Sequence, residues 1–214
     1  MRDAYFSKRH FLFDLDGTLV DSAAVHARAF VDALTPGHPA LAVSFKYAPY
    51  AGRPTREVFL ELGVQDEGEL LALVKSKQQL YRDALERGDV VAFAGAVALL
   101  ERLREKGARL FLVTGASRVS VERVLELTKL ARFFEGVTSA DDVQFGKPAP
   151  EPYLYTLAKF GLEKQDSMAV EDGESGIVAA QKAGLEAVLI HTDLDLPGVR
   201  NVRDCETFAT LLFP

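Results

Sequence analysis

Short apolar runs alternate along most of the chain with longer segments of helical periodicity, and this alternation restricts the fold more than any other feature. Strands that alternate with helices build βαβ units, in which the strands lie parallel in one sheet. The predicted strands are 10–13, 109–113, 136–138, 168–170 and 187–190, and the predicted helices between the later strands are 96–106, 119–127, 151–160 and 175–183. We therefore expect an α/β fold with a Rossmann-like core, in which helices flank a central parallel sheet.

One long segment, 22–89, interrupts the alternation directly after the first strand, because it contains helical patterns only. The expected domains are a catalytic core of residues 1–20 and 90–214 and an inserted all-helical cap of residues 21–89. An insert that leaves the core at the carboxyl end of a strand lies over that end of the sheet. There it can exclude water and select a substrate.

The composition excludes several classes of partner. Of the 214 residues 48% are apolar, which is enough to bury a sizeable core. The formal net charge of −6, without a cluster of Lys and Arg, argues against nucleic acid and acidic membrane surfaces as partners. The single cysteine, Cys205, cannot form an internal disulfide and is typical of a reducing compartment. We expect a cytoplasmic protein that is a monomer or a homodimer.

Two aspartates, Asp14 and Asp16, directly follow the first predicted strand in the stretch FLFDLDGTLVDS at residues 11–22. A buried strand has no use for carboxylates, and two charges this close repel each other unless a cation lies between them. Ligand sites of α/β proteins usually lie at the carboxyl ends of the strands. The two aspartates alone would also suit a turn or a helix cap, so the other strand ends decide between these interpretations.

Three further polar motifs follow later predicted strands in order. Thr114 comes after the strand 109–113, Lys147 stands in the stretch GKPAP before a helix, and Glu171 and Asp172 follow the strand 168–170. Each has an ordinary explanation, as a strand-end hydroxyl, a solvated lysine or acids at a helix start. Four such motifs in order at the ends of predicted strands are a much stronger signal than any one of them.

Together the four motifs resemble those of the haloacid dehalogenase superfamily over nearly the whole chain. The resemblance extends to the members with a helical cap, which include sugar-phosphate phosphatases, phosphoglycolate phosphatases and β-phosphoglucomutase. It implies that Asp14 is the nucleophile, which forms an aspartyl-phosphate, and that Asp16 is the general acid and base. It also implies that Thr114 and Lys147 bind the phosphoryl oxygens.

The same resemblance implies a Mg²⁺ ion held by Asp14, the backbone carbonyl of Asp16 and Asp172. Mg²⁺ prefers carboxylate and carbonyl oxygens, and it would remove the repulsion between the aspartates. Glu171 would bind the ion either directly or through water. Asp16 needs a raised pKa in one half of the cycle, and we expect burial beside another carboxylate to provide it.

Candidate substrate-binding residues lie in the helical insert. His26 resembles a histidine that hydrogen-bonds toward the second aspartate in sugar phosphomutases, and Lys77 resembles a cap lysine that reaches the substrate. The loop 52–56 resembles one in which an arginine binds a distal anion, with Arg56 as first choice and Arg53 as the alternative. Because exposed Lys and Arg are common, a surface role stays open for each of the three cations.

The function that these residues imply is a Mg²⁺-dependent phosphatase. It would hydrolyse a small phosphorylated metabolite, such as a sugar phosphate or phosphoglycolate, through an aspartyl-phosphate. The alternative is an isomerase similar to β-phosphoglucomutase, which would exclude water from the same intermediate. A dehalogenase would leave Asp16 without a role, and a non-catalytic binding module would not need Asp14 as a nucleophile.

Overall fold

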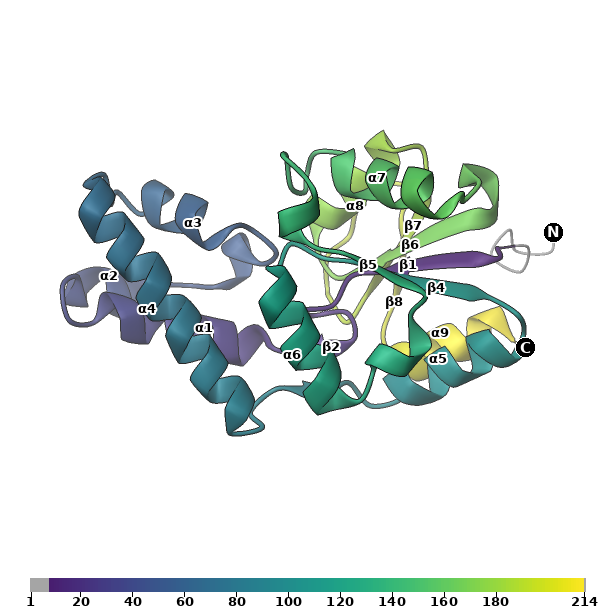
Figure 1. Ribbon diagram of the computed structural model, residues 1–214, viewed down its shortest axis with the longest axis horizontal. Helices are drawn as coiled ribbons and strands as arrows, with labels where there is room; N and C mark the ends of the chain where they lie inside the picture. Colours follow the sequence, from purple (N-terminus) through teal and green to yellow (C-terminus); the bar gives the residue numbers. More distant parts are fainter. Residues whose placement is uncertain (1–7, 214) are drawn as a thin grey trace.

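In the computed structural model, which describes residues 8–213, six strands form one sheet at the centre of the larger lobe (Figure 1). The strands are β1 His10–Phe13, β4 Arg109–Val113, β5 Gly136–Thr138, β6 Ser167–Glu171, β7 Glu186–Ile190 and β8 Arg200–Val202. Their order across the sheet is β5-β4-β1-β6-β7-β8, and every neighbouring pair is parallel. The predicted α/β fold with a central parallel sheet is confirmed.

One strand of this sheet, β8, was missed in the sequence analysis. The residues of β8, Arg200-Asn201-Val202, include one apolar side chain, and the strand lies at the edge of the sheet beside β7. A three-residue edge strand has no hydrophobic pattern long enough to distinguish it from a loop. The five predicted strands are present, and β6 and β7 extend slightly beyond their predicted limits.

Helices cover both faces of the sheet. They are α5 Ala96–Glu105, α6 Arg118–Thr128, α7 Glu151–Phe160, α8 Glu174–Lys182 and α9 Cys205–Leu212. In Figure 1, α7 and α8 lie on one side of the strands, and α5 and α9 lie on the other. Alternate residues of β1 explain the two layers, because Phe11 and Phe13 pack with α5 and α9, whereas Leu12 packs with α7 and α8. Both faces are buried, as is usual for a parallel sheet.

Residues 22–89 form a second group of helices, which we call the helical lobe. It contains α1 Ala23–Leu34, α2 Pro39–Ser44, the 3₁₀ turn Ala48–Tyr50, α3 Thr55–Glu61 and α4 Glu67–Glu86. The lobe has an apolar cluster of its own, centred on Phe30, Phe59 and Leu70. The longest helix is α4, and neither α4 nor any other helix within residues 8–213 has the length and apolar character needed to cross a membrane.

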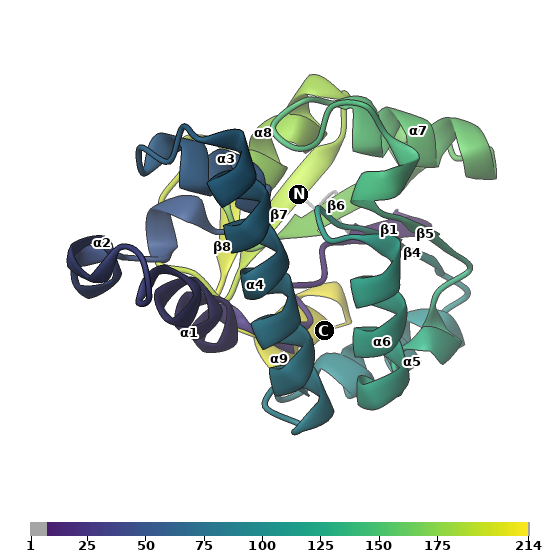
Figure 2. The ribbon, with the colours of Figure 1, turned by 60° about the vertical axis from the view of Figure 1, so that its left-hand side comes forward.

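Two short strands, β2 Val20–Asp21 and β3 Val91–Ala92, carry the chain into the lobe and out of it. They pair antiparallel, so the two connections lie side by side. The lobe lies beyond the carboxyl ends of the sheet strands (Figure 1). In Figure 2, α4 runs between α1 and α6, and Glu86 at the end of α4 pairs with Arg123 of α6. The lobe therefore faces the edge of the sheet at which the predicted site residues lie.

The burial of the sheet predicts a difference in stability between two phenylalanines. Phe111 of β4 is 0% exposed, whereas Phe145 is 61% exposed. Phe111→Ala should lower the free energy of unfolding by about 3–5 kcal/mol, because it leaves a cavity in the core. Phe145→Ala is the matched control and should change it by less than about 0.5 kcal/mol. Urea denaturation measures both values, and equal losses would contradict the packing described for β4.

Candidate active site

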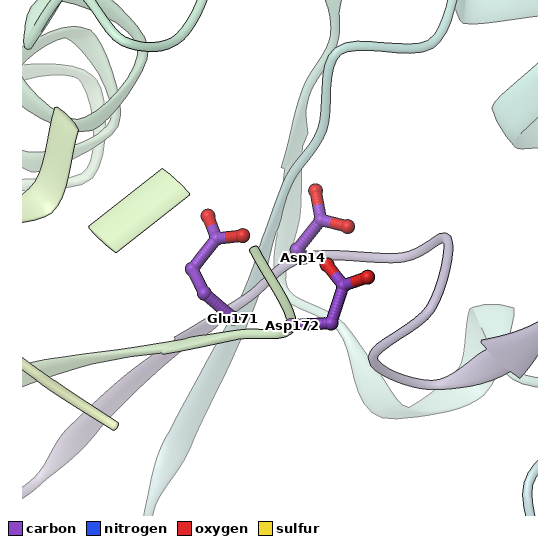
Figure 3. A group of neighbouring side chains, drawn as sticks. All are labelled: Asp14, Glu171 and Asp172. Carbon is purple, nitrogen blue, oxygen red and sulfur yellow. The ribbon is translucent and has the colours of Figure 1, made fainter. Parts of the chain in front are cut away.

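Three carboxylates meet at the carboxyl ends of β1 and β6. Asp14 follows β1, Glu171 is the last residue of β6, and Asp172 comes next. The two strands are adjacent and parallel, with Phe13 opposite Val170, so their ends meet at one edge of the sheet. One oxygen of each carboxylate lies within 4.8 Å of the others. Figure 3 shows the three side chains side by side.

A single lysine neutralises part of this negative charge. The ammonium of Lys147, whose side chain is 5% exposed, lies 2.7 Å from Asp14 Oδ1 and 2.5 Å from Glu171 Oε1. It also donates to the carbonyl oxygen of Val113 at 2.8 Å, so three protein acceptors use its three N–H donors. The hydroxyl of Tyr153 donates to the same oxygen of Glu171. Lys147 and Tyr153 thus fix Glu171 from two sides.

The pKa values show that the cluster lacks positive charge. Burial raises the pKa of Asp14 well above its usual value, although Lys147 acts in the opposite direction. Burial and the charge of Glu171 raise the pKa of Asp172 to about 7. Burial would lower the pKa of Lys147, but Asp14 and Glu171 outweigh burial and raise it. A second cation beside the carboxylates would remove this imbalance.

The donors of this cluster suit a hard divalent cation such as Mg²⁺, because all of them are oxygen atoms. Two glycines keep the space around them open. A Cβ on Gly17 would lie 2.0 Å from Asp172 Oδ2, and a Cβ on Gly176 would lie 2.0 Å from the carboxylate of Glu171. Gly17 also has a φ of +82°, which favours glycine. The residues present therefore fit the cation that the sequence implies.

Asp16 lies in a different environment, which the helical lobe provides. Its Oδ1 is 3.3 Å from His26 Nε2 and accepts a hydrogen bond from the hydroxyl of Tyr81 at 3.2 Å. Lys77 lies 2.9 Å from His26 Nδ1. Because the ammonium donates to Nδ1, His26 Nε2 carries the proton and donates to Asp16. Lys77 thus fixes the tautomer of His26, and His26 fixes the carboxylate of Asp16.

This environment corrects the expectation for the pKa of Asp16. Burial alone would raise that pKa, but the hydrogen bond from His26, with help from Tyr81, outweighs burial and lowers it to about 2. The sequence suggested that a neighbouring carboxylate would raise the pKa of Asp16, but the contact with His26 has the larger effect and lowers it. Burial and Lys77 lower the pKa of His26, and burial lowers that of Lys77 to about 8. In the free protein Asp16 is ionised at neutral pH.

The structure distinguishes the two arginines of the loop 52–56. Arg56, the first choice from the sequence, does not line the cavity described below, and its guanidinium pairs with Glu67 at 2.8 Å. Arg53 lines the cavity and pairs with Glu61 at 2.6 Å. The geometry therefore favours Arg53 over Arg56 as the cap arginine nearest the site. Residue spacing could not decide this, because the direction of each side chain depends on how the loop meets α3.

Sequence reasoning missed two tyrosines at the site. Tyr153, on the first turn of α7, reaches Glu171, and Tyr47 stacks on the ring of His26 with centroids 5.7 Å apart. Tyr81 also stacks on the His26 ring, with centroids 4.1 Å apart. Tyr47 lies in an irregular loop, where no periodicity points to it.

A cavity of about 1050 Å³ lies between the helical lobe and the sheet. Asp16, Lys147 and Asp172 contribute to its lining, so the polar cluster is open to a ligand. Thr114 is buried, and its hydroxyl oxygen accepts the Ala116 N–H at 3.1 Å. The hydrogen of that hydroxyl remains free to donate. The site thus joins oxygen ligands, a buried ammonium and an ionised aspartate at one end of a cavity.

Comparisons with known proteins agree with this arrangement. Residues 11–190 match the family described as haloacid dehalogenase-like hydrolase. A pyrophosphatase, PpaX of Anoxybacillus flavithermus, is 31% identical over 173 residues, which cover 81% of this chain and 79% of the relative. A hydrolase from Pseudomonas syringae shares the fold with a TM-score of 0.82 and 23% identity, over 96% of this chain and 98% of that chain. β-Phosphoglucomutase from Clostridium difficile has a TM-score of 0.79 and 21% identity, over 96% and 97% of the two chains.

The contact between Gly17 and Asp172 predicts an effect on cation binding. In Gly17→Ala the new methyl group forces the carboxylate of Asp172 away from Asp14, so the affinity for Mg²⁺ should fall by about tenfold or more. Gly88→Ala is the matched control, because Gly88 has a similar φ of +79° but no atom within 4 Å of a Cβ. Calorimetric titration with Mg²⁺ measures both variants. Equal affinities would show that the close approach at Gly17 is unimportant.

The raised pKa of Asp172 predicts how the metal-free protein responds to pH. Its folded-state pKa of about 7 lies above the value of about 4 for an unfolded chain. Between these values the folded protein keeps a proton that the unfolded chain has released. This contribution to the free energy of unfolding is therefore complete below about pH 4 and is lost as pH rises to about 7.

Asp172→Asn removes this titration. In metal-free buffer, the stability of Asp172→Asn minus that of the wild type should therefore increase as pH rises through this window. Chemical denaturation at several pH values measures the difference. A difference that stays constant would contradict the raised pKa.

Proposed function

The chain belongs to the haloacid dehalogenase-like hydrolase family, and on that premise we propose that this phosphatase is Mg²⁺-dependent and acts through an aspartyl-phosphate. Its substrate is a small phosphorylated metabolite, such as a sugar phosphate or phosphoglycolate. The observation that supports the mechanism best is the position of Asp14. Its carboxylate lies 2.7 Å from the ammonium of Lys147, beside Glu171 and Asp172. A nucleophile, a buried cation and oxygen ligands for a metal are the parts that phosphoryl transfer requires.

Asp14 attacks the phosphorus atom, and the bond to the leaving oxygen breaks. Lys147 holds Asp14 Oδ1, which orients the carboxylate and leaves Oδ2 for the attack. The ammonium also offsets the negative charge that develops on the phosphoryl oxygens. The free hydroxyl hydrogen of Thr114 is available to a phosphoryl oxygen. These groups are held by buried contacts before the substrate arrives, so little reorganisation accompanies the reaction.

Asp14, Asp172 and the backbone carbonyl of Asp16 would hold the Mg²⁺ ion. When bound, the ion supplies positive charge next to the phosphoryl group. Glu171 Oε1 already accepts from Lys147 and Tyr153, which supports the alternative in which Glu171 would bind the ion through water. The hydrogen bond from Tyr153 would position Glu171 for this role.

Asp16 moves the proton. It is ionised in the free protein, and a bound phosphate dianion raises its proton affinity, so that it enters the reaction as an acid. Asp16 gives its proton to the leaving oxygen. It then takes a proton from the water that attacks the aspartyl-phosphate, and this step releases phosphate and restores Asp14. His26 and Tyr81 orient the carboxylate through both steps.

The network around Asp16 also supports a second candidate, a phosphomutase. His26 and Lys77 come from the helical lobe, so the lobe controls whether Asp16 meets water or a sugar hydroxyl. In a mutase, the sugar would take the phosphoryl group back before water could react. We propose hydrolysis as the main activity and propose residues 21–89 as the cap that selects the substrate. A cytoplasmic location and a monomeric or homodimeric state complete the proposal.

The nucleophile gives the central test. Asp14→Asn should lower phosphate release by about a thousandfold or more, because the amide cannot form the covalent intermediate. Asp193→Asn, which changes an exposed aspartate, is the matched control and should keep full activity. The assay uses a panel of phosphorylated metabolites and pyrophosphate with Mg²⁺, and EDTA should abolish release. Undiminished release by Asp14→Asn would refute the mechanism.

One arm of this assay separates the two candidates. β-Glucose 1-phosphate is supplied with a trace of glucose 1,6-bisphosphate, and glucose 6-phosphate and free phosphate are both measured. Free phosphate without glucose 6-phosphate supports the phosphatase. Glucose 6-phosphate without free phosphate identifies a mutase.

A further inference from the structure

We propose that the leaving group of the substrate carries apolar surface and no second anionic group. This inference rests on the proposed function, because it concerns the same cavity. The preferred substrates are then phosphomonoesters of uncharged or cationic alcohols with a carbon-rich body. Of the two substrates proposed above, this favours the sugar phosphate over phosphoglycolate. Pyrophosphate and sugar bisphosphates are also poor substrates, since each has a second anion.

The first argument is the size of the cavity. Its volume of about 1050 Å³ is at the upper end of the roughly 300–1000 Å³ that is usual for sites of drug-sized ligands. Asp16, Lys147 and Asp172 are three of its lining residues, so the phosphoryl group occupies only the part of the cavity beside them. Pyrophosphate or phosphoglycolate would leave most of the remaining volume to water. A larger leaving group would fill it.

The second argument is the chemistry of the wall. Apolar residues from both lobes also line the cavity, among them Ala24 and Ala27 of α1, Ala48 and Ala51 of the segment before α3, and Val178 and Leu194 of the core. Short side chains leave room for a ligand and present carbon atoms to it. A carbon-rich leaving group gains free energy by leaving water for such a wall. The hydroxyls of Ser22, Ser175 and Thr192 also line the cavity, so a leaving group with hydroxyls can replace part of its water contacts, whereas a second charged group cannot.

The third argument is the charge of the wall. Apart from the catalytic groups, the charged residues among the described lining are Arg53, Glu57 and Glu174. The guanidinium of Arg53 already pairs with Glu61 at 2.6 Å. A second anion would therefore meet one occupied guanidinium and two carboxylates. The sequence suggested that a cap arginine binds a distal anion, but these acidic neighbours oppose that role.

His191 does not change this balance. It lines the cavity, and its ring stacks on Phe93 with centroids 3.9 Å apart. Burial lowers the pKa of His191, so its imidazole is uncharged at neutral pH. Outside the catalytic groups, the lining then carries two exposed carboxylates and one paired guanidinium, which disfavours a second phosphate or a carboxylate.

Three synthetic phosphomonoesters test the inference. Methyl phosphate and benzyl phosphate derive from alcohols of nearly equal acidity, so their intrinsic reactivities are similar. The wild type should show a kcat/KM for benzyl phosphate at least about tenfold above that for methyl phosphate, because the ring is buried against the apolar wall. The kcat/KM for 4-carboxybenzyl phosphate should fall by about tenfold relative to benzyl phosphate, because its carboxylate meets Glu57 and Glu174.

A double variant isolates the charge effect. Glu57→Gln with Glu174→Gln should raise the ratio of kcat/KM for 4-carboxybenzyl phosphate to that for benzyl phosphate by about fivefold. Glu105→Gln with Glu122→Gln is the matched control, because both residues are exposed glutamates that do not line the cavity. The control ratio should equal that of the wild type. Affinities of the three esters for the Asp14→Asn variant, measured by calorimetry, should follow the same order without catalysis.

The outcomes separate this inference from the function on which it rests. Asp14-dependent release with equal kcat/KM for methyl and benzyl phosphate would overturn the apolar wall and leave the phosphatase intact. Efficient release from 4-carboxybenzyl phosphate, pyrophosphate or phosphoglycolate would overturn the exclusion of a second anion and return Arg53 to the role of an anion ligand. Absence of release from every ester and from the metabolite panel would refute both the inference and the proposed function.

Discussion

The active site depends on one buried ammonium between two carboxylates. Lys147 lies 2.7 Å from Asp14 and 2.5 Å from Glu171, in a position with almost no contact with solvent. Removing one partner of such a pair costs roughly 3–5 kcal/mol, because the remaining charge is left buried without compensation. With Asp172 included, three carboxylates face the ammonium of Lys147. The excess negative charge favours the binding of a further cation. The proposed nucleophile, Asp14, and the proposed metal ligands belong to this cluster.

The parallel sheet brings these charges together. Asp14 follows β1, Glu171 ends β6, and the carbonyl of Val113 at the end of β4 accepts from Lys147. Because the three strands are adjacent and parallel, residues far apart in the sequence meet at one edge. The register between β1 and β6 matters, since a shift by one residue would turn Glu171 to the opposite face. The apolar residues on the two faces of the sheet fix this register, and they therefore also fix the positions of Asp14 and Glu171.

Sequence patterns were sufficient for the sheet strands other than β8 and for the meeting of Asp14, Lys147 and Asp172, because strand ends in a βαβ fold have one common edge. Sequence patterns were insufficient for properties that depend on contacts between side chains of the two lobes. The resemblance predicted the contact of His26 with Asp16, but not that this contact lowers the pKa of Asp16. The direction of Arg53 is a property of a loop. Burial and partners decide such features, and neither can be read from spacing.

The paired strands β2 and β3 give these cross-lobe contacts a further meaning. Val20–Asp21 and Val91–Ala92 join the helical lobe to the sheet, and the lobe has its own apolar cluster. Asp16 lies on the sheet side of this ribbon, whereas His26 and Tyr81 lie on the lobe side. A rotation about the ribbon would separate them and remove the hydrogen bonds that lower the pKa of Asp16. The position of the lobe and the proton affinity of Asp16 are therefore coupled, so a ligand that shifts the lobe also shifts the protonation of Asp16.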